Sequence, residues 1–352
     1  MRTVWVTGGA GFIGSHLVRY LVREYPSYRI HTLDALTYAG NLENLADVLP
    51  AANHTFHKID IANASAVQRL WHEAPPDIIL NLAAESHVDR SILSPMDFVH
   101  TNVLGTITLL EHARQYWQGR SDVLFYQVST DEVYGSLGEE GFFTEGSAYD
   151  PRSPYSASKA AADHFVRAYG HTYGIPYLIS NCGNNYGPFQ FPEKLIPLTI
   201  SRLIERKSIP VYGQGQNMRD WIYVEDHVRA IVLLMEKAPR QRTYLIGAQN
   251  CRPNIEVVQL LCSLYDEITG EKDSDRLITF VQDRPGHDFR YAICPSPLLH
   301  QLGWKPHMSF EEGLRQTIQW YRANGSWLER VRSGAYQEYF QRQYGERLSS
   351  LQ

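Results

Sequence analysis

Thr3-Val4-Trp5-Val6-Thr7-Gly8-Gly9-Ala10-Gly11-Phe12-Ile13-Gly14 is the stretch that decides the fold class predicted for this chain. Its first five residues form a β-branched run typical of a buried strand, and an apolar helical pattern follows. Between them, the glycines at 8, 11 and 14 give the pattern G-x-x-G-x-x-G. Glycine permits a tight turn and close backbone approach to a phosphate, and a helix N-terminus supplies N–H groups and a positive dipole. The stretch therefore predicts a strand, a phosphate-binding turn and a helix.

The alternation of strands and helices continues through the first half of the chain. Strands are expected at 29–33, 55–57, 77–80, 123–126 and 177–179, and helices at 64–73, 95–117 and 154–173. This order predicts an α/β fold built on a doubly wound parallel Rossmann sheet. The competing interpretation of the glycine pattern is a packing turn in a flavodoxin-like sheet.

The second half of the chain has a different spacing of predicted strands, helices and turns. Turn signals become denser after Asn181, and shorter elements follow, including helices at 224–236, 254–268 and 309–323. We therefore expect a dinucleotide-binding Rossmann domain over 1–185 and a smaller mixed α/β substrate domain over 186–352, with some segments packing back on the first domain. The aromatic and charged stretch from Trp327 to Tyr344 is expected to be a surface helix or tail, with its aromatic stripe more typical of packing than of binding.

Composition excludes several classes of function. The formal net charge of −5 and the pI near 6.3 argue against a basic surface of the kind that binds nucleic acid. No apolar run reaches the roughly 18 residues of a membrane span, and the first strand begins too early for a signal peptide. The four cysteines have no C-x-x-C spacing, and the scattered histidines indicate no metal site. Free thiols of this kind are typical of a reducing compartment, so a cytoplasmic protein is expected.

Asp34 ends the second predicted strand and indicates which dinucleotide is bound. A carboxylate there accepts hydrogen bonds from a ribose 2′-OH and repels a 2′-phosphate, which favours NAD over NADP. Asp60 and Ile61, after the third predicted strand, are placed to flank the adenine. The alternative is that Asp60 serves only as a helix N-cap.

A second group of polar residues follows the strand predicted at 123–126. The segment Ser129-Thr130-Asp131-Glu132-Val133-Tyr134-Gly135 lies at its carboxyl end, where open α/β sheets bind ligands. Tyr155 and Lys159 are four residues apart on a predicted helix, so they share one face. A phenol, an ammonium group, a hydroxyl and two carboxylates would then converge and could move several protons. The alternative is a strand-end turn with solvated acids.

The spacing of the glycine triad and Tyr-x-x-x-Lys resembles that of the extended short-chain dehydrogenase/reductase family. The resemblance implies that Tyr155 transfers a proton, while Lys159 binds the nicotinamide ribose and lowers the pKa of the tyrosine. It also implies the set of NAD-binding residues, which are Gly8, Gly11, Phe12, Ile13, Gly14, Asp34, Leu36, Thr37, Asp60, Ile61, Leu82, Ala83, Ala84, Thr101, Tyr155, Lys159 and Asn185. A free phenol titrates near ~10, and two adjacent cationic groups would favour its phenolate.

The acidic pair Asp131 and Glu132 restricts the resemblance to one group of enzymes within this family. Extended short-chain epimerases usually carry small residues where this chain has Asp131 and Glu132, whereas the pair is similar to that of the dTDP-glucose 4,6-dehydratases. That resemblance spans about residues 1 to 325 and includes the motifs at 34–41, 83–91, 184–188, 191–197, 219–221 and 283–288. One departure is Gly183, where the family usually has serine.

The resemblance implies a lyase that converts dTDP-glucose to dTDP-4-keto-6-deoxyglucose with NAD. Tyr155 would take the C4 hydroxyl proton, and Thr130 would hydrogen-bond the C4 oxygen. Glu132 would remove the C5 proton, and Asp131 would protonate the departing C6 hydroxyl. Mutual repulsion and burial should keep one acid protonated, although the sequence does not assign which.

The second domain is expected to bind the nucleotide sugar. Expected substrate residues are Ser86, Thr130, Asn184, Lys194, Leu195, Pro210, Tyr212, Arg219, Asn254, Arg284, His287 and Tyr291. Arg219 suits a diphosphate because its guanidinium is a bidentate cation. Alternatives are a surface ion pair between Arg219 and Asp220, and a merely solvated His287. The contiguous Ser86-His87-Val88-Asp89 imitates a hydrolase triad, but contiguous loop residues do not aim at one another as a triad does.

Two other functions remain to be weighed. One is a related nucleotide-sugar 4,6-dehydratase or 4-epimerase, and the other is a dinucleotide-sensing regulatory module without catalysis. The acidic pair argues against an epimerase, since epimerisation expels no water. The intact set of Thr130, Tyr155 and Lys159 argues against a sensor. The family resemblance also implies a homodimer, formed through the helices near 95–117 and 154–173, with no nucleic-acid or membrane partner.

Overall fold

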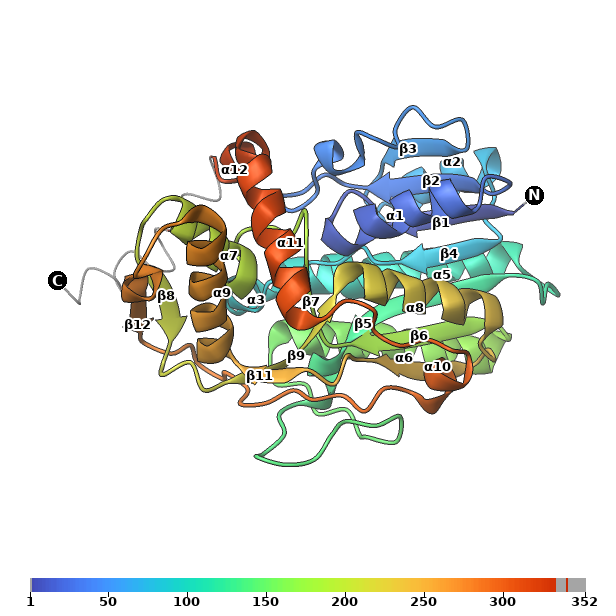
Figure 1. Ribbon diagram of the computed structural model, residues 1–352. Helices are drawn as coiled ribbons and strands as arrows, with labels where there is room; N and C mark the ends of the chain where they lie inside the picture. Colours follow the sequence, from blue (N-terminus) through green and yellow to red (C-terminus); the bar gives the residue numbers. More distant parts are fainter. Residues whose placement is uncertain (1, 334–339, 341–352) are drawn as a thin grey trace.

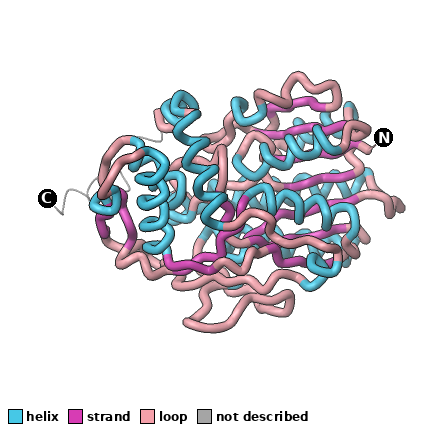
Figure 2. The backbone as a smooth tube through the Cα atoms, in the orientation of Figure 1, coloured by secondary structure: helices cyan, strands magenta, loops and turns pink. Residues whose placement is uncertain are grey.

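The computed structural model describes residues 2–333 and residue 340. Its largest element is a seven-stranded sheet in the order β10-β6-β5-β4-β1-β2-β3, in which every neighbouring pair is parallel. The strands are β1 (Thr3–Thr7), β2 (Arg29–Asp34), β3 (His54–Lys58), β4 (Ile78–Asn81), β5 (Leu124–Thr130), β6 (Tyr177–Cys182) and β10 (Arg242–Ile246). Helices cover both faces (Figures 1 and 2). The predicted doubly wound parallel α/β fold is confirmed.

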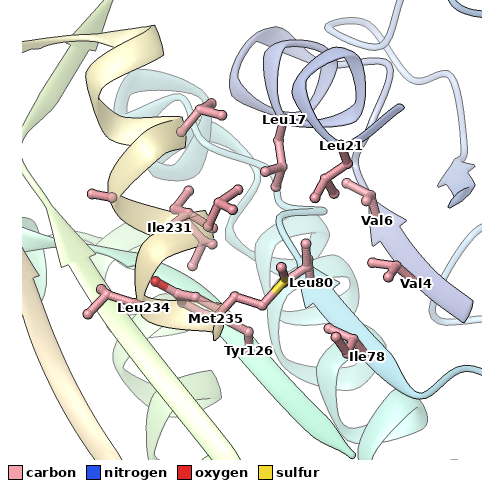
Figure 3. Close-up of a cluster of buried hydrophobic side chains, with 14 of the residues drawn as sticks. Val4, Val6, Leu17, Leu21, Ile78, Leu80, Tyr126, Ile231, Leu234 and Met235 are labelled. Atoms are coloured by element: carbon pink, nitrogen blue, oxygen red, sulfur yellow. The ribbon is translucent and has the colours of Figure 1, made fainter. Parts of the chain in front are cut away.

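Two apolar layers hold the helices against this sheet. One face carries α1 (Phe12–Glu24), α8 (Val224–Lys237) and α10 (Pro297–Gln301), and the other carries α2 (Ala64–Glu73), α5 (Gly105–Tyr116) and α6 (Pro154–Tyr173). In Figure 3, Leu17 and Leu21 of α1 face Ile231 and Met235 of α8 above strands β1 and β4. Both α8 and β10 come from the second half of the chain, and they complete the core of the first domain.

The order of the strands in the main sheet determines where a ligand-binding crevice forms. The chain proceeds from β1 through β2 to β3 on one side and from β4 through β5 to β6 on the other. The loops that follow β1 and β4 therefore separate, which leaves a crevice at the carboxyl ends of the strands. The loop after β5 opens on the same edge, so the glycine-rich turn and the acidic pair lie at one end of the sheet.

Local signals fix the start and end of α6. The Ser153 side chain accepts a hydrogen bond from the Ser156 N–H, the Ser156 hydroxyl accepts one from the Ser153 N–H, and Pro154 occupies the first turn. Gly174 ends the helix in the left-handed region, with φ of 71°. Tyr155 consequently lies in the first turn of α6.

The helix predicted over 95–117 is interrupted in the structure. It consists of α4 (Pro95–Phe98), a π-helical turn over Val99–Leu104 and then α5. The Asn102 amide within this turn donates to the Ser158 hydroxyl at 2.8 Å and to the Glu85 carbonyl at 3.0 Å. These bonds tie the widened turn to α6 and to the loop after β4. Turns of this type are frequent at functional sites, and this one brings Thr101 to the crevice.

The rest of the chain forms a smaller mixed α/β region. Its elements are β7 (Asn184–Tyr186), α7 (Leu195–Ile204), β8 (Ile209–Tyr212), β9 (Met218–Tyr223), β11 (Cys251–Pro253), α9 (Asn254–Thr269), β12 (Ile278–Val281), α11 (Phe310–Ala323) and α12 (Gly325–Val331). The short helix α3 (Val88–Leu93) packs instead against α4 and α6. A separate apolar core joins α7, α9 and α11. None of the helices in the described part of the chain has the length and apolar character that a membrane crossing requires.

The helix at Trp327, α12, lies at the surface with only Trp327 and Leu328 buried, and its aromatic side chain serves in packing, as expected for the aromatic stripe. The Trp327 side chain is 5% exposed and packs with Trp320 and Tyr321 of α11. Its indole N–H donates to the Asn44 side chain at 2.9 Å, and the Asn44 amide donates to the Ala10 carbonyl in the glycine-rich turn. This helix therefore packs against the first domain. Most of the predicted stretch to Tyr344 lies outside the described residues.

Acid is expected to destabilise the fold through buried histidines such as His16. Burial lowers the pKa of His16 to about 4, although its ring donates to the Pro188 carbonyl. Because the folded pKa lies below the unfolded value near 6.5, this contribution is present above pH 6.5 and is lost as pH falls toward 4. His16→Gln should therefore reduce the pH dependence of the unfolding free energy in this window by up to about 1.4 kcal/mol per pH unit. Urea denaturation of both proteins at several pH values measures this, and equal slopes would contradict it.

Candidate active site

The turn after β1 is shaped for a phosphate. Gly8 has φ of 67°, and a Cβ there would lie 2.7 Å from the Ala83 backbone nitrogen. A Cβ at Gly14 would lie 2.1 Å from the Gly8 carbonyl oxygen, so the turn and helix α1 approach too closely for a side chain. Gly11, the N-cap residue of α1, offers no side-chain acceptor. The first N–H groups of α1 are thus left for a ligand, which fits a dinucleotide pyrophosphate.

Asp34 is held rigidly beside this turn. One carboxylate oxygen accepts the Ala10 N–H at 3.0 Å, and the other accepts the Leu36 N–H at 2.8 Å. Burial raises the pKa of Asp34, and these two hydrogen bonds oppose the rise. The carboxylate lines the cavity and retains acceptor capacity for ribose hydroxyls.

Thirteen of the predicted cofactor residues line one cavity in the crevice. They are Gly8, Gly11, Phe12, Ile13, Gly14, Asp34, Thr37, Asp60, Ile61, Leu82, Ala83, Ala84 and Thr101. Leu36 does not line it and instead donates its N–H to Asp34. Asn185 lines the adjoining cavity, while Tyr155 and Lys159 are buried and line neither cavity.

The second cavity adjoins the first and is lined by all twelve predicted substrate residues. Residues common to both are Phe12, Ile13, Ser86, Cys182, Gln190, Glu193 and Lys194. Thr130, Asp131 and Glu132 lie on the wall of the second cavity, whereas Ser129 lines the first. A ligand in each cavity would therefore meet at the end of β5.

A short 3-10 helix over Asp131–Tyr134 orients the acidic pair. The Thr130 hydroxyl accepts the Glu132 N–H at 3.2 Å and donates to Asp131 Oδ1 at 3.3 Å. Asp131 is 1% exposed, and its Oδ2 has no hydrogen-bond partner within the described part of the chain. The alternative of a strand-end turn with solvated acids is therefore wrong for Asp131.

The surroundings affect the pKa values of Asp131 and Glu132 differently. Burial, with the charges of Glu132 and Asp220, raises the pKa of Asp131 well above its ordinary value. Burial also raises the pKa of Glu132, but Arg284, Lys194 and Arg219 oppose that rise. Asp131 is thus the better proton donor, and Glu132, surrounded by cations, is the better base.

Tyr155 is buried behind the acidic pair, 8% exposed, and packs against Phe98 with ring centroids 6.3 Å apart. Burial, followed by the charge of Glu132, raises the pKa of its phenol well above the ordinary value, whereas a hydrogen bond with Thr130 lowers it. Lys159 donates to the Val128 carbonyl at 2.8 Å, and burial lowers its pKa while Asp163 opposes the change. The protein groups around the phenol hence favour its neutral form.

Cationic groups gather at the far end of the second cavity. Arg219 is 5% exposed, donates to the backbone carbonyls of Met218, Phe289 and Asp288, and lies 4.2 Å from the centre of the Tyr291 ring. The alternative of a surface ion pair with Asp220 is wrong, because both residues are buried and Asp220 accepts the Asn250 N–H. Arg284 pairs with Asp89 at 3.3 Å.

His287 is not merely solvated. Its Nδ1 lies 2.7 Å from Asp283, and its ring packs against Tyr212. Burial, together with Arg284 and Arg219, lowers the pKa of His287 to about 4, so the ring is neutral near pH 7.

The sequence predicted no binding role for several residues that line the second cavity, among them His87, Asp89, Cys182, Gln190 and Glu193. Glu193 is 5% exposed and binds Arg90 and the Tyr38 hydroxyl, which links the loop after β2 to the segment before α7. The position of Glu193 next to Lys194, inside the family-like motif at 191–197, was the sequence feature that could have predicted its place at the site. At Gly183, a Cβ would lie 2.7 Å from the Asp220 carbonyl oxygen, so a serine here would require β9 to shift.

Comparison with known proteins identifies the family. A family model described as GDP-mannose 4,6 dehydratase matches residues 5–317. The chain is 51% identical over 344 residues to the dTDP-glucose 4,6-dehydratase of Xanthomonas campestris pv. campestris (strain B100), covering 96% of this chain and 97% of that protein.

Solved structures agree with this relationship. DesIV, a dTDP-glucose 4,6-dehydratase from Streptomyces venezuelae crystallised with NAD, is 42% identical, with a TM-score of 0.86 and coverage of 94% of this chain and 99% of that chain. A UDP-glucose 4-epimerase from Thermus thermophilus, in complex with NAD, is 30% identical, with a TM-score of 0.81 and coverage of 92% and 99%. This chain belongs to the family of the dTDP-glucose 4,6-dehydratases.

Proposed function

We propose that this chain is a lyase that catalyses the NAD-dependent 4,6-dehydration of dTDP-glucose, with the acidic pair Asp131 and Glu132 as the acid and base of water loss. The product is dTDP-4-keto-6-deoxyglucose, a precursor for deoxysugar biosynthesis. The observation that carries the proposal is the pair itself, at the junction of a dinucleotide cavity and a polar cavity. Burial raises the pKa of Asp131 well above its ordinary value, whereas three cations oppose the rise at Glu132.

The first step is oxidation at C4. Tyr155 accepts the C4 hydroxyl proton, while Thr130 hydrogen-bonds the C4 oxygen. NAD supplies the redox chemistry of the cycle, because it accepts the C4 hydride and returns a hydride at C6. The protein neighbours of Tyr155 raise the pKa of its phenol, so a positive charge bound beside it, such as that of an oxidised nicotinamide ring, would favour the phenolate.

The second step is loss of water across C5 and C6. The C4 ketone acidifies the C5 proton, which Glu132 removes. Asp131 donates its proton to the departing C6 hydroxyl, a role that suits its raised pKa and burial. After hydride returns to C6, Glu132 returns a proton to C5.

The second cavity suits the nucleoside diphosphate of the substrate. Arg219, Arg284 and Lys194 supply positive charge, and Asn184 and Asn254 line the same wall. Burial of the Arg219 guanidinium strengthens its attraction for a diphosphate. The preference for thymidine over other bases rests on the family relationship.

The direct experiment is to incubate the protein with a panel of nucleotide sugars, followed by mass spectrometry. Loss of one water from dTDP-glucose is expected. Interconversion with the C4 epimer at unchanged mass would favour an epimerase, and no turnover of any sugar would favour a sensing module. The chain's four free cysteines suit the cytoplasmic location proposed for this activity.

We propose also that the protein is a homodimer that buries an apolar patch on adjacent helices. The patch consists of Ile92, Leu93, Met96, Val99 and Leu104 on α3 to α5, with Phe165 and Tyr173 on α6, all of them exposed in the single chain. These helices pack against one another, and the proposed interface joins their exposed apolar side chains. An apolar surface of this kind is typical of an obligate interface.

Met96→Glu should weaken this dimer, because the Met96 side chain is 69% exposed in the single chain and a buried unpaired carboxylate is costly. Sedimentation velocity should show a shift from dimer toward monomer. Phe280→Glu is the matched control, since Phe280 is 43% exposed on β12 in the smaller region, away from these helices. A monomeric wild-type protein, or equal effects of both substitutions, would contradict the proposed interface.

A further inference from the structure

The loop that follows β2, residues 35–41, is fixed to the first domain at both ends. The Leu36 N–H donates to Asp34 Oδ1 at 2.8 Å, and the Asn41 N–H donates to the Ala10 carbonyl at 3.1 Å. Four residues of this loop line the dinucleotide cavity, namely Ala35, Thr37, Ala39 and Gly40. Because Asp34 lines the same cavity, a dinucleotide held at Asp34 has the 35–41 loop as part of its enclosure.

A second segment, residues 190–194 before α7, lines the same cavity and is joined to the loop by Tyr38. The Tyr38 hydroxyl donates to Glu193 Oε1 at 3.1 Å, and its ring packs edge-on against Phe191 with centroids 5.5 Å apart. Arg90 of α3 donates through Nε to Glu193 Oε2 at 3.2 Å, and its guanidinium carbon lies 3.8 Å from the centre of the Tyr38 ring. Three segments distant in sequence therefore meet at one buried carboxylate.

The chemistry of this cluster suits a firm contact. Burial raises the pKa of Tyr38 well above its ordinary value, so the phenol keeps its proton near pH 7 and can donate it in a hydrogen bond. Burial raises the pKa of Glu193 too, while Lys194 and Arg90 oppose that rise. Hydrogen bonds that involve an ionised group are stronger than those between neutral groups.

The cluster lies outside the cavity that it closes. Tyr38 and Arg90 do not line the dinucleotide cavity but a separate surface hollow, and Gly40 and Phe191 line both. Tyr38 thus acts through the walls of the cavity and not by contact with a bound dinucleotide.

The 190–194 segment is also anchored independently of Tyr38. The Lys194 ammonium group donates to the Ser86 carbonyl, in the loop after β4, at 2.7 Å. Loss of the Tyr38 hydroxyl should therefore free the 35–41 loop and leave this segment in place.

We infer that Tyr38 and Glu193 are positioning residues that hold the 35–41 loop against the 190–194 segment and thereby retain the nicotinamide cofactor through the whole catalytic cycle. The inference rests on the proposed function, in which the cofactor reduced at C4 must still be bound when C6 is reduced. A loop that opened between the two steps would let the reduced cofactor leave and would strand an oxidised sugar. Opening requires that the contacts of Tyr38 break, so these contacts slow the release.

The test compares the release of reduced cofactor from Tyr38→Phe and from Tyr28→Phe. Protein loaded with NADH is mixed with excess NAD, and the decay of the bound NADH fluorescence gives the release rate. Phenylalanine at 38 keeps the ring between Arg90 and Phe191 and removes only the hydroxyl. Release should be about 10-fold faster than from wild-type protein, as expected when a hydrogen bond to a charged group is lost.

Tyr28→Phe is the matched control, because it removes the same kind of contact elsewhere. The Tyr28 hydroxyl donates to Glu236 at 3.2 Å, and neither residue lines either cavity. This variant should release NADH at the wild-type rate. Equal rates in Tyr38→Phe and wild-type protein, or equal acceleration in both variants, would overturn the inference.

A double variant tests whether Tyr38 and Glu193 act through one contact. Glu193→Ala should accelerate release at least as much as Tyr38→Phe, because it also removes the partner of Arg90. The double variant should then release NADH no faster than Glu193→Ala alone, whereas independent effects would multiply and contradict the shared contact. If Tyr38→Phe does not fold, a wild-type release rate in Glu193→Ala would overturn the inference equally.

A turnover experiment links retention to the reaction. With dTDP-glucose, Tyr38→Phe should release free NADH together with a 4-keto sugar that has not lost water or gained hydrogen at C6, and wild-type protein should not. The release assay contains no sugar, so it is independent of the assay for water loss. Equal release rates together with intact dehydration would reject the role of Tyr38 and leave the dehydratase assignment standing.

Discussion

Replacement of Asp131 by asparagine is expected to slow product formation by about 10²–10⁴-fold, the usual contribution of a general acid. Asparagine is close in shape but has no acidic proton for the departing C6 hydroxyl. Oxidation at C4 depends on Tyr155, so it should be spared, and reduced nicotinamide should accumulate on the protein. Stopped-flow absorbance of the reduced cofactor, together with rapid quench of the product, measures both steps.

Asp150→Asn is a suitable control for this experiment. Asp150 is an exposed carboxylate that pairs with Arg152. Its substitution should leave both steps unchanged. An equal loss of oxidation and dehydration in Asp131→Asn would show that Asp131 has no specific role in water loss.

Tyr155→Phe is expected to abolish the reaction at an earlier point. The phenylalanine ring preserves the packing against Phe98 and Val88 but cannot accept the C4 hydroxyl proton. Product formation should fall by at least about 10²–10⁴-fold, and no reduced nicotinamide should accumulate. The same stopped-flow measurement therefore separates Tyr155 from Asp131.

Tyr134→Phe is the matched control for this substitution. Tyr134 is also buried, and its hydroxyl contacts the Asn181 side chain at 3.4 Å. Loss of that contact should change the rate little. Accumulation of reduced nicotinamide in Tyr155→Phe would contradict its role as the base for oxidation.

Sequence periodicity predicted most strands and helices of the first domain. The β-branched runs and glycine signals predicted strands β1 to β6, and the helix predicted over 154–173 placed Tyr155 and Lys159 correctly on α6. Periodicity could not show that β10 completes the main sheet, because pairing between strands distant in sequence is a tertiary property. It also could not show the π-helical turn, which accompanies contacts of Asn102 with distant residues.

The candidate site was predicted by two kinds of signal. The glycine turn and Asp34 follow from elementary chemistry, and their cavity formed as expected. The substrate residues came from the family resemblance, since nothing in the local pattern brings Arg219 of β9 near Glu132 of the loop after β5. The difference between the two acids depends on Asp220 and on three cations from other segments, which explains why sequence alone left it open.

The partners of Trp327 illustrate another limit of sequence reasoning. The sequence favoured packing for the aromatic side chains of this stretch, but it did not show which residues Trp327 packs against. In the structure its indole N–H binds Asn44, which also supports the glycine turn through Ala10. A contact between residues so far apart in the sequence produces no periodic pattern from which it could be predicted.

The central claim is that one bound cofactor moves a hydride within one sugar. The direct test uses dTDP-glucose labelled with deuterium at C4, mixed with unlabelled substrate that is distinguished by heavy carbon. The account predicts that deuterium appears at C6 of product molecules that began with the label, while free reduced cofactor does not accumulate. Transfer of deuterium to the heavy-carbon product, or stoichiometric release of reduced cofactor, would contradict the account and indicate an ordinary dehydrogenase.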